Sequence, residues 1–188
     1  MNLPNKLTLF RIILIVPFVI VMLSGTVGEL LGDATWWVAF GIFVIASLTD
    51  MLDGRIARKY NLITTFGKFM DPLADKLLVC SAMICLIELE RIPAWVVILI
   101  IAREFIISGF RLVAADKGVV IAAGIWGKMK TVTQMVMVCI MIVEYSIPGL
   151  EKILPVIADV IMWIAVVLTI VSLVEYLVRN RGVLKDEK

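Results

Sequence analysis

Two pairs of aspartates stand close together in the first half of this 188-residue chain. Asp50 and Asp53 are spaced i, i+3, and Asp71 and Asp75 are spaced i, i+4. If each flank is helical, each pair projects from one face of its helix, and a tight turn over residues 61–67 would bring the pairs together. Four clustered carboxylates repel one another, so they hold either protons or cations. An all-oxygen ligand set suits magnesium or manganese.

The aspartates belong to a longer pattern, D-x2-D-G-x2-A-R-x8-G-x3-D-x3-D. Its eight fixed positions are Asp50, Asp53, Gly54, Ala57, Arg58, Gly67, Asp71 and Asp75. The pattern resembles the signature of the CDP-alcohol phosphotransferases, which are integral membrane enzymes of phospholipid synthesis. Chance matches at all eight positions have odds on the order of one in ten billion per start position. The alternative is a set of solvated charges on a membrane-surface loop.

The resemblance implies a role for each residue of the pattern. Asp50, Asp53 and Asp71 would be ligands of Mg²⁺ or Mn²⁺, with two ions in the site, and Asp75 would be both a ligand and the general base. The donor implied is CDP-diacylglycerol, which would contact Asp50, Asp53, Gly54, Ala57, Arg58, Thr64 and Gly67. A carboxylate beside a divalent ion has a lowered pKa, so the role of Asp75 as a base depends on its geometry.

The composition predicts the elements that must position these residues. Apolar residues make up 62% of the chain and the mean hydropathy is +1.05, against about 45–50% apolar residues in a soluble domain. The chain is therefore expected to be a polytopic membrane protein. It has no histidine, which excludes Ser-His-Asp and Cys-His catalysis, and its net charge of +2 gives no case for nucleic-acid binding.

Six apolar runs are each long enough to cross about 30 Å of hydrocarbon as a helix. They cover residues 8–24, 35–57, 69–89, 93–114, 126–146 and 153–178. The predicted fold is all-α: six transmembrane helices in a single domain, residues 1–188, with a short interfacial helix within residues 1–11. No cleavage site for a signal peptide follows this segment.

The positive charges predict the orientation. With the N-terminus in the cytoplasm, 16 of the 18 lysines and arginines fall on the cytoplasmic half, and only Arg91 and Lys152 fall outside. This bias is the positive-inside pattern of the cell membrane. It places the aspartate pattern on the cytoplasmic side, where CDP-linked substrates are made.

A second group of charged residues lies in the fourth and fifth runs. Arg103, Glu104 and Arg111 lie within a span, where a charge costs about 2.5–3.5 kcal/mol, and such residues usually have a functional role. Adjacent residues do not face each other on a helix, so we expect only weak pairing between Arg103 and Glu104. Arg103, Arg111 and Lys128 are predicted to bind an anionic acceptor. Anchoring of Lys128 at the membrane surface is the alternative.

The segments AREFIISGFR and AAGIWGKMKT, with the opening NLPNKLTLFR, resemble the branch of the family whose acceptor is sn-glycerol 3-phosphate. The inositol-phosphate branch is the closest rival, because its acceptor also carries a phosphate. The family resemblance implies a homodimer as well. The competing class is a small cation channel or transporter with an acidic mouth.

Overall fold

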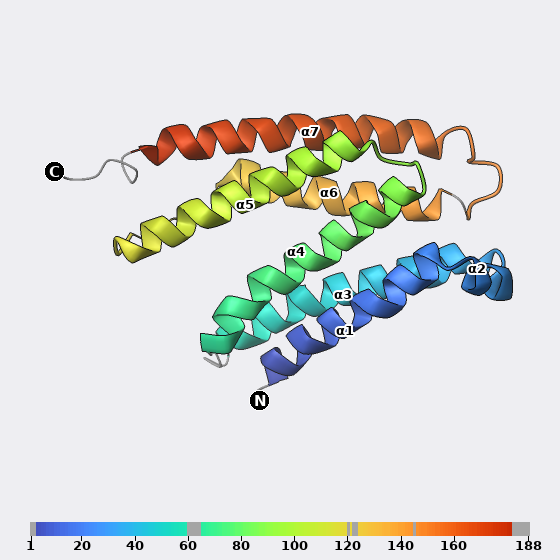
Figure 1. Cartoon of the computed structure of the whole chain (residues 1–188), viewed down its shortest axis with the longest axis horizontal. Helices are drawn as coiled ribbons and strands as arrows, with labels where there is room; N and C mark the ends of the chain where they lie inside the picture. The colour runs from blue at the N-terminus through green and yellow to red at the C-terminus, as the bar shows by residue number, and fades with distance from the viewer. Residues whose placement is uncertain (1–2, 60–64, 120, 122–123, 145, 182–188) are drawn as a thin grey trace. The chain divides into compact units, whose positions relative to one another are not determined.

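The structure, a computed structural model, describes residues 3–59, 65–119, 121, 124–144 and 146–181. Within these ranges, the side chains of residues 3–4, 50–59, 65–69, 71–72 and 75 fall outside the description. The described chain is all helical (Figure 1): α1 Leu3–Leu23, α2 Gly25–Leu31, α3 Ala34–Lys59, α4 Thr65–Glu88, α5 Ala94–Asp116, α6 Ile125–Val143 and α7 Leu154–Arg179. The predicted all-α fold is confirmed, and each of the six predicted spans corresponds to one long helix.

The beginning of the chain differs from the expectation. Residues 3–11 do not form a separate interfacial helix, because α1 is one continuous helix of 21 residues. Pro4 stands in its first turn, where a missing N–H is tolerated. The connection after α1 contains the short helix α2, which the sequence analysis treated as a break. Ser24 caps α2 by accepting a hydrogen bond from the Val27 N–H, and Gly32 ends it with a φ of +54°.

Three described helices are long and apolar enough to cross a membrane: α1 over Asn5–Leu23, α6 and α7. A fourth candidate is the pair formed by α2 and Ala34–Thr49 of α3, whose axes differ by 108°. The helix α5 is long enough but carries Arg103, Glu104 and Arg111. The protein is thus a helical membrane-type protein, and the count of six spans stays a prediction.

The chain divides into two compact units. The first comprises residues 1–92 and 138–155, and in it α1 contacts both α3 and α4 (Figure 1). Phe18 of α1 and Phe43 of α3 pack at 5.9 Å between ring centroids. Arg91 donates hydrogen bonds to both carboxylate oxygens of Glu144 and to the carbonyl oxygen of Pro155. This buried ion pair joins the end of α4 to the segment after α6.

The second unit comprises residues 93–137 and 156–188, and it contains α5, most of α6 and most of α7. The rings of Trp95 and Trp163 pack at 5.8 Å near one end of α5. Near its other end, Phe110 and Tyr176 meet edge to face at 5.5 Å. From Val97 onward, buried residues of α5 recur every three or four positions: Val97, Ile100, Arg103, Ile107, Phe110 and Ala114. Arg103 therefore occupies a core position of an amphipathic helix.

Candidate functional site

The aspartate pattern lies on two described helices, but its side chains do not belong to the described part of the structure. Asp50, Asp53, Gly54, Ala57 and Arg58 lie in the last turns of α3, and Gly67, Asp71 and Asp75 in the first turns of α4. Thr64 falls outside the described residues altogether. The backbone of both pairs is therefore helical, as their i, i+3 and i, i+4 spacing predicted. Among residues with described side chains there is no cluster of three or more potential metal ligands.

One face of α1 adds buried polar groups that the sequence analysis did not assign to a site. Asn5, Thr8 and Arg11 follow one another at intervals of three residues, and all three are buried, Arg11 completely. Because α1 contacts both α3 and α4, this face brings polar groups into the unit that carries the aspartate pattern. The sequence pattern that could have indicated this face is N-x2-T-x2-R, because a spacing of three residues places polar side chains along one side of a helix.

The second unit contains a buried charge network built from three helices. Glu104 of α5 accepts hydrogen bonds from Arg103 Nη1 at 2.8 Å and from Lys130 Nζ of α6 at 2.5 Å. Arg103 Nε donates to Ser172 Oγ of α7 at 3.2 Å, and Ser172 in turn donates to the carbonyl oxygen of Thr169. The side chains of Arg103 and Lys130 are only 9% and 2% exposed. In this network two cations share one carboxylate.

The expectation of only weak pairing between Arg103 and Glu104 was wrong. Adjacent side chains leave a helix in different directions, but both of these are long enough to converge beyond the backbone. Lys130 on the neighbouring helix favours this geometry, because the Glu104 carboxylate lies where it can accept from both cations. Neither Lys130 nor Ser172 was assigned to the site from the sequence. A serine in an apolar span gives no charge signal, so Ser172 could not be recognised in that way.

The Arg103 guanidinium also lies against Gly127 of α6. A methyl group at Gly127 would come within 3.3 Å of Arg103 Nη2, which is closer than ordinary van der Waals contact. Nη1 and Nε are occupied by Glu104 and Ser172, whereas no described residue accepts a hydrogen bond from Nη2. The absence of a side chain at Gly127 therefore leaves room beside Nη2, the guanidinium nitrogen whose N–H groups have no described acceptor.

The structure places the other two predicted acceptor residues at the surface of the second unit. Arg111 and Lys128 are both exposed, and no described contact joins them directly to Arg103. The Arg111 guanidinium lies 5.8 Å from the centroid of the Tyr176 ring, in the range of a cation–π interaction. Arg103 thus contacts Ser172 while Arg111 contacts Tyr176, one helical turn farther along α7.

The two arginines contact neighbouring positions of α7. Eight residues separate them on α5, which corresponds to about 12 Å along the axis and roughly 80° in azimuth. Their contacts on α7 are four residues apart, which is about 6 Å along one face of that helix. Both arginines therefore extend toward the same face of α7.

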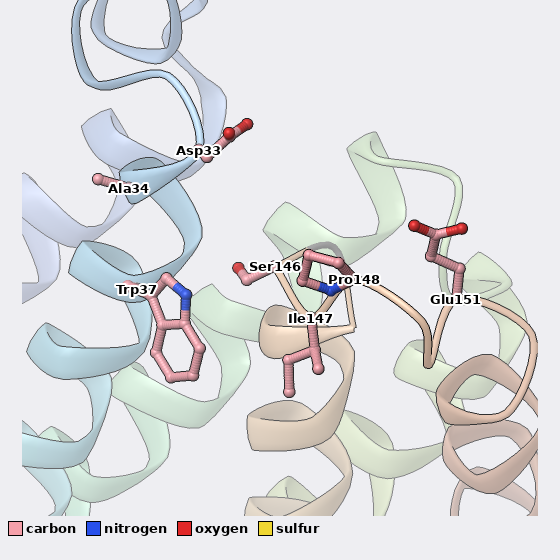
Figure 2. A pocket seen from close by; sticks show the side chains of 7 residues that line it. All are labelled: Asp33, Ala34, Trp37, Ser146, Ile147, Pro148 and Glu151. Carbon is pink, nitrogen blue, oxygen red and sulfur yellow. The ribbon is translucent and has the colours of Figure 1, made fainter.

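A pocket of about 510 Å³ lies elsewhere in the first unit (Figure 2). It is lined by Asp33, Ala34 and Trp37 around the start of α3 and by Ser146, Ile147, Pro148 and Glu151 after α6. In Figure 2 the Ser146 side chain points toward Trp37, and the two carboxylates point away from the indole ring. Thirteen residues of α3 separate Trp37 from Asp50, about 20 Å along the axis. This pocket is therefore distinct from the aspartate pattern.

Comparison with known proteins gives a consistent result over almost the whole chain. The profile of the CDP-alcohol phosphatidyltransferase family matches residues 1–171. The CDP-diacylglycerol–glycerol-3-phosphate 3-phosphatidyltransferase of Bacillus subtilis is 48% identical over 190 aligned positions, which cover 98% of this chain and 97% of that protein.

The chain belongs to the CDP-alcohol phosphatidyltransferase family. A protein of the same name from Rickettsia typhi is 39% identical, with 91% of this chain and 92% of that protein covered. A probable phosphatidylglycerophosphate synthase of Mycobacterium tuberculosis is 38% identical, with 95% and 81% covered. The resemblance stated from the aspartate pattern is confirmed.

The aspartate pattern, Arg103, Arg111 and Lys128 all lie within residues 1–171, the part of the chain that the family profile matches.

Proposed function

We propose that this protein transfers the phosphatidyl group of CDP-diacylglycerol to sn-glycerol 3-phosphate, giving phosphatidylglycerophosphate and CMP. Full-length similarity to relatives named for this reaction supports the proposal. The structural observation that carries the choice of acceptor is Arg103, a buried guanidinium whose Nη2 lies over Gly127 and has no described acceptor. Such a nitrogen can donate a charge-assisted hydrogen bond to a phosphate, and these bonds are among the strongest in proteins.

In the proposed reaction, a hydroxyl oxygen of the acceptor attacks the phosphorus that carries the diacylglycerol. The bond between this phosphorus and the bridging oxygen of the pyrophosphate breaks, and CMP leaves with that oxygen. The proton of the hydroxyl passes to a base, which we assign to Asp75. Gly54 lets the nucleotide approach the backbone of α3, Arg58 offers a guanidinium fork to the pyrophosphate, and Thr64 donates to the nucleotide.

The four aspartates provide only hard oxygen donors, which fit magnesium or manganese. We propose that Asp50, Asp53, Asp71 and Asp75 hold two such ions. When bound, the ions would neutralise charge on the pyrophosphate and on the leaving CMP. The aspartates themselves would hold CDP-diacylglycerol at the C-terminal end of α3 and the N-terminal end of α4, next to the cytoplasmic surface.

The acceptor phosphate is assigned to Arg103, Arg111 and Lys128. Arg103 offers Nη2, which lies over Gly127, and Arg111 reaches the same face of α7. Lys128 is exposed at the beginning of α6, where it adds a third positive charge. A phosphate with two negative charges could accept charge-assisted hydrogen bonds from these three residues.

The membrane arrangement completes the proposal. We propose six spans with both chain ends in the cytoplasm, an arrangement that would put the aspartate pattern on the cytoplasmic side of the cell membrane, as the positive-inside pattern predicts. The lipid tails of the donor would then enter from the bilayer. The homodimer implied by the family resemblance stays a prediction.

An acceptor screen with the purified protein tests this function. CMP release from CDP-diacylglycerol in detergent should require magnesium or manganese and glycerol 3-phosphate. Inositol phosphate used in preference to glycerol 3-phosphate would move the enzyme to the rival branch. The transporter alternative predicts no CMP release with any acceptor.

A further inference from the structure

The last helix contributes two residues that contact the proposed acceptor arginines. Ser172 accepts from Arg103 Nε, and Tyr176 lies beneath the Arg111 guanidinium. Both residues are buried, with relative exposures of 1% and 4%. They are therefore candidates for residues that position the two guanidinium groups.

Each residue is itself held in place. The Ser172 hydroxyl donates to the carbonyl oxygen of Thr169, which leaves its lone pairs for Arg103. The Tyr176 ring packs edge to face on Phe110 and belongs to a small core with Ile107. Both side chains are fixed before a ligand arrives, so they can define the directions of the two guanidinium groups.

The Tyr176 hydroxyl has an unusual environment. It is buried, and no hydrogen-bond partner is found for it among the described residues. A buried hydroxyl without a partner loses a hydrogen bond that it would make in water. Its position next to Arg111 and one turn from Ser172 makes an anionic ligand held by the two arginines a suitable partner.

We propose that Ser172 and Tyr176 are positioning residues that align Arg103 and Arg111 on one acceptor phosphate, with the Tyr176 hydroxyl as a further donor to the acceptor. The inference rests on the proposed function, because it takes the arginines to bind the acceptor. Two arginines eight residues apart on one helix diverge by roughly 80°. The proposed positioning explains how both can bind the same phosphate. The face of α7 draws both guanidinium groups together, so the pair acts as one phosphate site.

The test is steady-state kinetics on Ser172→Ala, Tyr176→Phe and Tyr176→Leu in the full-length protein, with glycerol 3-phosphate and CDP-diacylglycerol varied in turn. Ser172→Ala and Tyr176→Phe should each raise the KM for glycerol 3-phosphate about threefold to tenfold, the effect of one hydrogen bond. Tyr176→Leu should raise it further, because the cation–π contact is also lost. The KM for the donor should stay within about twofold throughout.

Two further measurements separate positioning from folding. Ser146→Ala is the matched control, because it removes a buried hydroxyl of the first unit that also lacks a described partner; it should leave both KM values unchanged. Inorganic phosphate is the probe of the anion site, and its inhibition constant against glycerol 3-phosphate should rise in parallel with KM. Tyr176→Phe keeps the ring and its packing, so it remains informative if Tyr176→Leu does not fold.

Three outcomes would overturn the inference. Unchanged acceptor KM in Ser172→Ala and Tyr176→Phe, alongside a raised KM in Arg103→Ala, would remove α7 from the acceptor site and leave the proposed function standing. An equal rise in both KM values would mean that the residues serve only the fold. Unchanged acceptor KM in Arg103→Ala would refute the acceptor site itself, and the positioning role with it.

Discussion

Replacing Arg103 with lysine should keep a positive charge in the second unit. It removes the guanidinium group, whose separate nitrogens can donate hydrogen bonds in different directions. Arg103 divides three nitrogens among Ser172, Glu104 and the space over Gly127. A lysine ammonium is one point of charge, and its nearest partner would be the Glu104 carboxylate. The donor that is proposed to bind the acceptor would therefore be lost. One hydrogen bond from a charged group to a phosphate is worth about 1.5–3 kcal/mol, which predicts a rise in acceptor KM of about tenfold to a hundredfold.

The charge balance predicts that this variant folds. Even complete removal of the Arg103 charge would leave Glu104 paired with Lys130, so no buried charge would lack a partner. Removing the carboxylate is different, because Glu104→Ala takes away the acceptor that Arg103 and Lys130 share, at 9% and 2% exposure of these two side chains. Breaking a buried pair in this way costs about 3–5 kcal/mol. Thermal unfolding in detergent should therefore show Glu104→Ala as the less stable of the two variants.

The assay for Arg103→Lys is CMP release with each substrate varied in turn. Arg179→Lys is the control, because Arg179 is exposed and makes only a surface pair with Glu175 at 3.6 Å. The control should match the unaltered protein in both KM values. Two results would refute the assignment of Arg103 to the acceptor phosphate. One is a KM for glycerol 3-phosphate in Arg103→Lys within twofold of the value for the unaltered protein. The other is a KM for CDP-diacylglycerol that rises as much as the KM for glycerol 3-phosphate.

Three further predictions concern the aspartate pattern, the orientation in the membrane and Gly127. Asp50→Asn should abolish CMP release at saturating magnesium in protein that still folds, because an amide lacks the carboxylate's charge; near-normal turnover would contradict its role as a ligand. A cysteine replacing Lys117 should react with impermeant reagents only from the cytoplasm, and one replacing Lys152 only from outside; reversed labelling would refute the orientation. Gly127→Ala should raise the KM for glycerol 3-phosphate about threefold or more by crowding Arg103. Gly109→Ala, which adds the same methyl to α5 where nothing lies within 4 Å, should not change it.

The long helices could be predicted from the sequence because each contains an apolar run of membrane-spanning length. The run predicted over residues 35–57 corresponds to α3, and the run over 153–178 corresponds to α7. The short helix α2 was missed because seven residues give too few turns for a periodic signal, and its Ser24 cap is only a local feature. The interfacial helix was wrongly separated from α1, since a change in polarity along a helix does not require a break in its backbone hydrogen bonds.

The sequence by itself determined the family and the acidic pattern, because eight residues at fixed spacing are a property of the chain and need no fold to be recognised. It also determined that Arg103 required an explanation, since a charge in an apolar span is costly wherever its partners lie. Only the tertiary structure decided what those partners are. Glu104 and Arg103 converge because Lys130 approaches from α6, and Ser172 and Tyr176 receive the two arginines because α7 packs against α5. These contacts join residues up to 69 positions apart, and spacing along the chain carries no information about which distant helices become neighbours.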